Sequence, residues 1–142
     1  MTTAFSAVTI VDHPVDAVWE RLVDWDTANQ WMPGVQTVRA NGPVAAGSPV
    51  TFTSRGKERL ATIVAVGPGR SITLRSVQGA VVADYTYECV AHGRGTRVGL
   101  VADCSMTGPI RLLGPVIRHA IRRADGGQLA AFAATFTTAP HG

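Results

Sequence analysis

The feature that most constrains the fold is a block between positions 35 and 106, in which six successive segments alternate apolar and polar residues. Alternation with a period of two is typical of strands that bury one face. The links between the segments are short and rich in glycine, which favours antiparallel pairing of neighbours. The pattern predicts strands at 35–40, 50–54, 59–66, 71–77, 81–90 and 96–106.

The residues before this block predict one more strand and two short helices. Segment 3–11 is rich in β-branched residues and is typical of a strand. Proline is favoured at the first position of a helix, so Pro14 predicts a helix that begins near residue 15. A second short helix is expected at 25–31, where the Pro33–Gly34 turn ends it.

The residues after the block predict a long C-terminal helix. Apolar residues recur at helical spacing from Ile110 to Phe136, a stripe longer than most helices of globular proteins. Gly114–Pro115 and Gly126–Gly127 are its weak points, and we expect a kink near one of them. The tail from about residue 137 is expected to fray.

These elements predict an α+β fold in a single domain spanning residues 1–142. Its seven-stranded antiparallel curved sheet wraps around the long C-terminal helix, with two short helices between the first two strands. Such a sheet has one apolar face, which the long helix covers. A curved sheet and one helix do not close tightly everywhere, so we expect an apolar cavity between them.

Composition excludes several classes of protein. Hydrophobic residues make up 46% and charged residues 16% of the chain, which is incompatible with a disordered protein. No apolar run approaches the ~20 residues of a membrane-spanning helix. The N-terminus, Met1 to Ser6, lacks the pattern of a secretory signal. We therefore expect a cytoplasmic protein without stable membrane insertion.

Charge and motif patterns argue against nucleic-acid, metal and cofactor binding. The net charge of +3 comes mostly from scattered arginines, without the interleaved aromatics of nucleic-acid binders. Cys89 and Cys104 form no CxxC pair, and the four histidines show no metal-ligand spacing. Phosphate-binding glycine loops and nucleophile motifs are missing. We expect no nucleic-acid partner, no metal and no cofactor, and a monomer or a homodimer.

Three stretches carry a resemblance to a known superfamily: residues 8–35, residues 67–75, and residues 85–98 followed by 108–114. They resemble the START-related (SRPBCC) superfamily, and most closely its bacterial polyketide cyclase/dehydrase and lipid-transport group. The resemblance implies a helix-grip fold like that of START domains and birch-pollen allergens, with a hydrophobic ligand inside. The shared motifs are helix caps, turns and core aromatics, so they are specific for the fold rather than for a reaction.

Alternation along the strands indicates which side chains face the cavity. Tyr85 and Tyr87 share the inner face of their strand with Cys89, while Arg75 faces solvent on the neighbouring strand. The register around Arg59 stays open. Val50, Phe52 and Ser54 are expected to point inward. The predicted cavity lining comprises Trp31, Met32, Phe52, Leu74, Ser76, Tyr85, Tyr87, Leu100, Leu113, Ile117, Ala120 and Ile121.

The leading functional hypothesis is binding or transport of a hydrophobic small molecule, such as a lipid, an isoprenoid or a polyketide-like compound. Burial of apolar ligand surface would supply ~25 cal/mol per Å². The alternative is a polyketide cyclase or dehydratase, with Tyr85, Tyr87 and His119 as weak catalytic candidates. An inward Arg, His or carboxylate with a shifted pKa would favour the enzyme, and neutral hydroxyls alone would favour the carrier.

A second alternative is an accessory protein that docks to a membrane or a larger enzyme. Arg118, Arg122 and Arg123 form the densest basic cluster and would supply the docking surface. The competing interpretation of this cluster is a solvated helix face.

Overall fold

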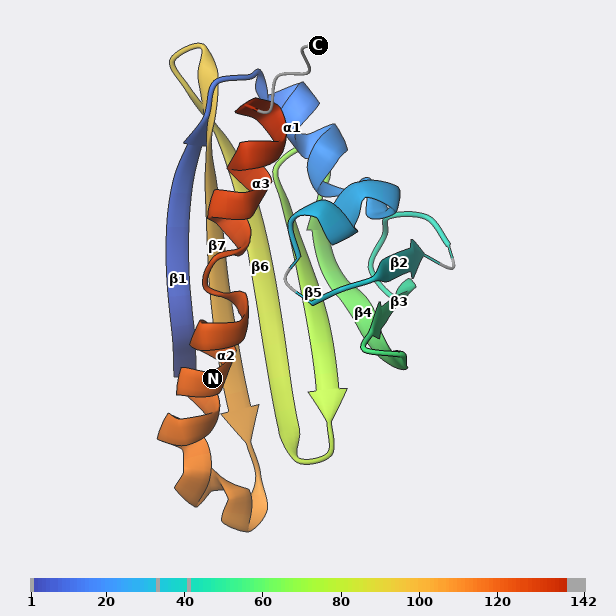
Figure 1. The fold of residues 1–142 in the computed structure, drawn as a ribbon, viewed down its shortest axis with the longest axis vertical. Helices are drawn as coiled ribbons and strands as arrows, with labels where there is room; N and C mark the ends of the chain where they lie inside the picture. The colour runs from blue at the N-terminus through green and yellow to red at the C-terminus, as the bar shows by residue number, and fades with distance from the viewer. Residues whose placement is uncertain (1, 33, 41, 138–142) are drawn as a thin grey trace.

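The computed structural model describes residues 2–32, 34–40 and 42–137. Its seven strands form one antiparallel sheet in the order β1-β7-β6-β5-β4-β3-β2, which confirms the predicted fold class (Figure 1). The tail that the sequence predicts to fray lies almost wholly outside the described residues. The strands are β1 (Thr2–Val11), β2 (Thr37–Ala40), β3 (Pro49–Ser54), β4 (Lys57–Gly67), β5 (Ser71–Gln78), β6 (Val81–His92) and β7 (Gly95–Met106).

Helical segments lie between the first two strands and after the last one. The two predicted short helices are α1 (Val15–Leu22) and the 3-10 helix η1 (Trp25–Gln30). Pro14 precedes the first helical residue as its cap rather than occupying it. The C-terminal segment consists of the 3-10 helix η2 (Gly108–Leu113), then α2 (Gly114–Asp125) and α3 (Gln128–Thr137). No described helix is long and apolar enough to cross a membrane.

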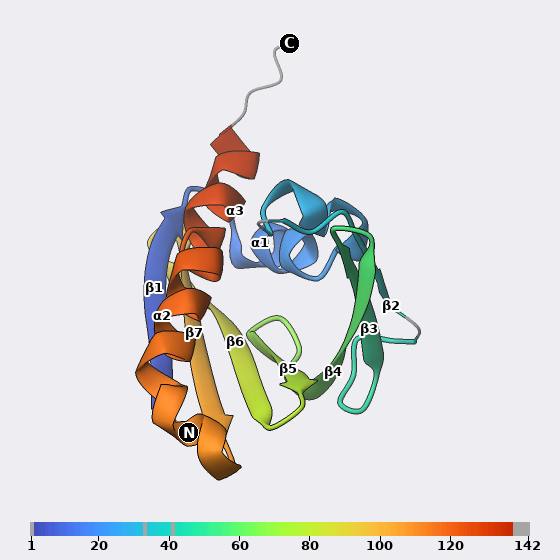
Figure 2. The same ribbon diagram turned by 60° about the horizontal axis from the view of Figure 1, so that its bottom comes forward.

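The long helix is interrupted at Gly126–Gly127, one of the two predicted weak points. The Gly126 N–H donates to the Arg122 carbonyl at 2.8 Å, and a Cβ added at Gly126 would lie 2.5 Å from that same oxygen. Only glycine fits so close an approach. The break lets α2 and α3 follow the curved sheet as two separate rods along β1 and β7 (Figures 1 and 2).

Side-chain alternation on the central strands follows the prediction. Tyr87 and Cys89 of β6 are buried, and Arg75 on the outer face of β5 is exposed. The alternating β7 side chains that face the same side are all buried, namely Val98, Leu100, Ala102 and Cys104. On the outer face, Arg75 makes two hydrogen bonds to the Asp84 carboxylate, at 2.8 and 2.9 Å. The regular alternation therefore gives the sheet a buried inner face and an exposed outer face, and the outer face carries apolar side chains such as Val8, Ile10 and Val77 beside the polar ones.

An aromatic cluster fills the space under α1 and α3. The Trp31 ring meets the Phe132 ring edge-on at a centroid distance of 5.1 Å and the Tyr87 ring at 5.8 Å. Phe132 also meets Phe136 at 5.4 Å. Trp31 and Phe132 are both almost fully buried, at 2% and 0% exposure. Edge-to-face contacts of this kind add to the hydrophobic gain of burial and fix the rings in place, so this end of the interior is packed solid.

Candidate functional site

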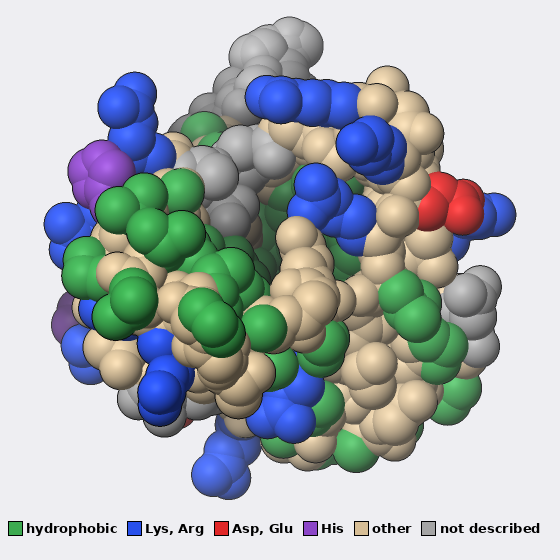
Figure 3. Space-filling model, turned by 90° about the horizontal axis from the view of Figure 1, so that it is seen from below, with side chains coloured by type: hydrophobic (Ala, Val, Ile, Leu, Met, Phe, Trp, Pro, Cys, Tyr) green, Lys and Arg blue, Asp and Glu red, His purple; other side chains and the backbone are tan. Residues whose placement is uncertain are grey.

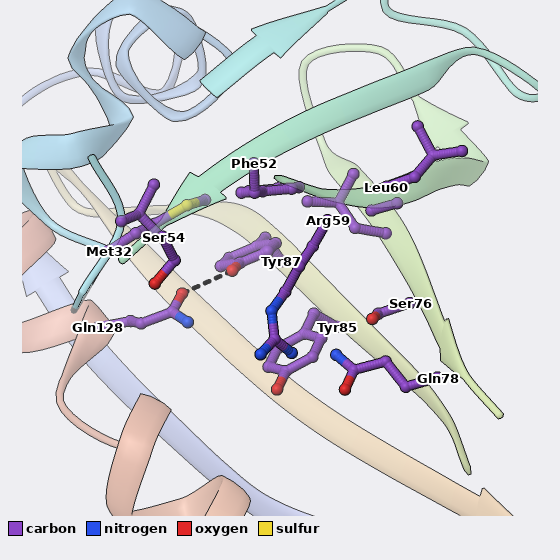
Figure 4. A pocket seen from close by; sticks show the side chains of 13 residues that line it. Met32, Phe52, Ser54, Arg59, Leu60, Ser76, Gln78, Tyr85, Tyr87 and Gln128 are labelled. Carbon is purple, nitrogen blue, oxygen red and sulfur yellow. Dashed lines mark hydrogen bonds between the residues drawn. The ribbon is translucent and has the colours of Figure 1, made fainter. Parts of the chain in front are cut away.

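A cavity of about 290 Å³ lies between the sheet and the break in the C-terminal helices. Its walls come from β3, β4, β5 and β6, from the segment after η1, and from the start of α3 (Figure 4). The lining residues are Met32, Val35, Phe52, Ser54, Arg59, Leu60, Ala61, Leu74, Ser76, Gln78, Tyr85, Tyr87 and Gln128.

A second hollow of about 240 Å³ adjoins the first. Ser76, Gln78 and Tyr85 line both, so the two hollows lie side by side and are together called here the cavity. The second hollow extends under α2, where Ile117 and Ile121 face Val81 and Ala83 of β6. From below, the molecule is visibly hollowed between hydrophobic and arginine or lysine side chains (Figure 3). Each hollow is close to the lower limit of typical small-molecule sites.

The cavity wall changes from apolar to polar along β5. On β5 the inward side chains are Ile72 and Leu74, which are buried, and then Ser76 and Gln78, which are increasingly accessible. The cavity therefore has an apolar inner end at Met32, Phe52 and Leu74, and a polar outer end at Ser76 and Gln78. A site of this kind matches a ligand that is apolar at one end and polar at the other.

A buried hydrogen bond closes the inner end. The Tyr87 hydroxyl donates to Gln128 Oε1 at 2.6 Å, and the bond is drawn in Figure 4. Gln128 is the first residue of α3, so the break at Gly126–Gly127 places it over β6. Its side chain is 5% exposed, and a buried amide needs such partners. This bond ties the start of α3 to the sheet at the cavity wall.

Arg59 contributes a charged side chain to the cavity wall. The register that the sequence left open is settled by a β-bulge in β4 between Ile63 and Ala65. Ile63 pairs with Leu74 and Ala61 with Ser76, so the inner face of β4 continues to Arg59. Its guanidinium extends toward Tyr85 and Gln78 (Figure 4). The neighbouring Glu58 faces the other way, where it pairs with Arg39 at 3.1 Å.

The structure places eight of the twelve predicted lining residues at the two hollows. Met32, Phe52, Leu74, Ser76, Tyr85 and Tyr87 line the first hollow, and Ile117 and Ile121 line the second. Trp31 and Leu100 are buried in the packed interior instead. Trp31, which is 2% exposed, therefore belongs to the core rather than to the cavity wall.

Three predicted residues of the C-terminal segment do not face the cavity. Leu113 is 54% exposed, because the 3-10 turn of η2 has a tighter period than an α-helix and shifts Leu113 off the stripe of Ile117 and Ile121. Ala120 is also exposed. His119 is exposed rather than buried. It follows Ile117 by two positions in an α-helix, and this spacing places its side chain on the opposite side of the helix.

Several lining residues were not predicted. Val35, Leu60, Ala61 and Gln78 extend the walls, and Ser54, which was expected to point inward, belongs to them too. Gln128 carries a usable signal, because it is a polar residue four positions before Phe132 on the apolar stripe. Arg59 lacked such a signal because the bulge in β4 changes the phase of the alternation along the strand.

The electrostatic features of the described residues are few. Burial, with a smaller contribution from Glu88, raises the pKa of the Cys89 thiol to about 11. Both cysteines are free and buried. No group of His, Cys, Asp or Glu in the described ranges could hold a metal ion. Of the basic cluster, Arg122 and Arg123 are exposed, while Arg118 is half-buried with its guanidinium beside Gly114.

The fold and the cavity define a helix-grip protein with an internal hydrophobic site. The sequence matches the family described as polyketide cyclase / dehydrase and lipid transport over residues 2–137. The chain therefore belongs to this family, as the resemblance in the sequence implied. Among curated proteins, none matches the chain.

Solved structures share this fold at low sequence identity. TTHA0849 from Thermus thermophilus is 17% identical, with a TM-score of 0.73 over 96% of this chain and 98% of its own. Ara h 8.0201 is also 17% identical, with a TM-score of 0.66 over 95% and 97%. The di-domain ARO/CYC StfQ from the steffimycin biosynthetic pathway is 17% identical, with a TM-score of 0.69 over 92% of this chain and 49% of its own.

Proposed function

We propose that this protein binds a hydrophobic small molecule, of lipid, isoprenoid or polyketide-like type, in the cavity between the sheet and α2–α3. The observation that carries the proposal is the cavity itself: two adjoining hollows of about 290 and 240 Å³ with a mostly apolar wall. Membership of a family described by polyketide cyclisation and lipid transport supports it. An apolar guest gains ~25 cal/mol for each Å² of surface that leaves water.

The side chains around the cavity favour binding over acid–base catalysis. The lining of both hollows, within the described residues, includes neither a carboxylate nor an imidazole. The inward charge is Arg59, and a guanidinium has five donors and no acceptor. It can hold an anion, but it cannot take up a proton as a general base does.

Cyclase or dehydratase activity is the second candidate function, favoured by the family and by the phenolic hydroxyls of Tyr85 and Tyr87 at the wall. The test is turnover of an aromatic polyketide precursor by the wild type and by Tyr85→Phe and Tyr87→Phe. Loss of turnover without loss of binding would establish catalysis. Equal turnover in all three, at the rate of the buffer alone, would exclude it.

Native mass spectrometry of protein purified from its own host tests the binding proposal. We expect a species heavier than the 14.9 kDa chain, which loses a hydrophobic compound on denaturation. A parallel titration uses a neutral fluorescent apolar probe, N-phenyl-1-naphthylamine. An empty protein that also fails to bind the probe would contradict the proposal.

A further inference from the structure

The inward side chain of Arg59 gives one part of the cavity wall a positive charge. It leaves β4 on the inner face, at the register set by the bulge, and its guanidinium lies beside Tyr85 and Gln78 (Figure 4). The guanidinium is exposed to solvent and carries a full positive charge, so it can pair with an anion that enters the cavity. The described lining of both hollows offers amide, hydroxyl and phenol groups but no carboxylate to Arg59.

The surroundings of Arg59 fix the direction in which a ligand would lie. The inner end of the cavity, at Met32, Phe52 and Leu74, is mostly apolar and buried or half-buried, and the polar groups of Tyr87 and Gln128 at this end are hydrogen-bonded to each other. Ser76, Gln78 and Arg59 lie at the accessible end, and Arg59 and Gln78 are both exposed to solvent. The cavity is therefore polarised, with an apolar interior and a cationic, hydrogen-bonding outer part.

From this polarity we infer that the ligand is an amphiphile with an anionic head, a carboxylate, which pairs with Arg59 while its apolar part fills the interior. The inference rests on the proposed function and specifies its ligand class. A planar guanidinium fork matches a carboxylate in two parallel hydrogen bonds, which sets orientation as well as affinity. Gln78, the next polar residue at this end, supplies an amide donor to the same head.

Isothermal titration of dodecanoate and of neutral 1-dodecanol, which share one chain length, tests the inference. Wild type should bind dodecanoate roughly ten- to a hundredfold more tightly, the range expected of a hydrogen bond to a charged group. Arg59→Gln should remove this preference, because dodecanoate then loses its charged partner while dodecanol never had one. Arg59→Lys should retain part of it, because lysine keeps the charge but not the fork.

The matched control is Arg97→Gln, which removes an exposed arginine of β7 and the same unit of charge. It should leave the preference intact, and added salt should weaken dodecanoate binding but not dodecanol binding. Equal affinity of the wild type for both ligands, or a preference that survives in Arg59→Gln, would overturn the inference while leaving the proposed function standing. Failure to bind either ligand would overturn the inference, and failure to bind N-phenyl-1-naphthylamine as well would overturn the proposed function.

Discussion

The interior under the C-terminal helices has two halves, built on the same strands. The packed half lies under α1 and α3 and contains Trp31, Tyr87, Leu129 and Phe132, all 2% exposed or less. The hollow half lies toward α2, which contributes the half-buried Ile117 and Ile121 to the cavity wall. Strands β5 and β6 run from one half into the other. The difference in packing between the halves therefore comes from the side chains rather than from the backbone topology.

Strand β5 shows how the sequence produces this change. Its inward residues run from Ile72 in the packed half, through the buried Leu74 at the cavity wall, to Ser76 and Gln78 in the hollow half. The short side chain of Ser76 leaves space below the facing helix, and Ser76 and Gln78 together give that space a hydrogen-bonding wall. On this strand face, the change from apolar residues to Ser76 and Gln78 produces part of the cavity wall. The alternation that forms the sheet continues through the change unbroken.

The largest contrast between the halves should appear in stability. Phe132→Ala removes a ring that is fully buried among other rings and should cost about 3–5 kcal/mol. Ile121→Ala enlarges a space that is already open, so we expect a loss of about 1 kcal/mol. Urea unfolding measures both. Similar losses for the two variants would show that the halves are equally packed.

Filling the hollow half should abolish binding and leave the fold intact. Ser76→Phe places a ring between both hollows, and we expect the Kd for the neutral probe to rise at least about tenfold, or ~1.4 kcal/mol. Val77→Phe, on the exposed face of the same strand, is the matched control and should bind as the wild type does. If both variants bind normally, the probe lies elsewhere.

The hydrogen bond at the boundary between the halves should make a smaller contribution. Tyr87→Phe leaves the buried Gln128 amide without its donor and should cost about 1–2 kcal/mol in unfolding free energy. The double variant Tyr87→Phe with Gln128→Leu removes both partners and should recover part of that loss. A double variant that is less stable than Tyr87→Phe would argue against this role.

The smallest expected effect concerns pH. The pKa of Cys89 is raised from 9.0 to about 11 in the folded protein, so between these values the unfolded chain releases a proton that the folded chain keeps. Stability from this thiol is present below pH 9.0 and is lost as the pH rises toward 11. Cys89→Val should flatten this decline. Parallel curves of unfolding free energy against pH, for variant and wild type, would contradict it.

The sequence could predict the sheet because its signals are local and repeated. On β6 and β7 the alternation runs without interruption, so Tyr87, Cys89 and Leu100 could be placed inside from the pattern alone. The break at Gly126–Gly127 was similarly visible, since glycine pairs weaken a helix. These features need no knowledge of distant partners.

The cavity could be predicted only in part, because bulges and changes of helix type alter the phase of a pattern. On β4, counting residues back from the inward Val66 would place Leu60 inside and Arg59 outside, but the bulge after Ile63 reverses this. In the same way, the 3-10 turn of η2 moves Leu113 into solvent. Such shifts are set by tertiary pairing, and a single sequence does not reveal them.

Nuclear magnetic resonance mapping of the neutral probe on the ¹⁵N-labelled protein tests the central claim most directly. Binding in the hollow half should shift the backbone amides of Ser76, Gln78 and Tyr85 on the sheet and of Ile117 and Ile121 on α2. Amides of the outer face of the sheet, around the exposed Val8 and Ile10, should stay in place. Shifts confined to that outer face, or none at saturating probe, would contradict the claim.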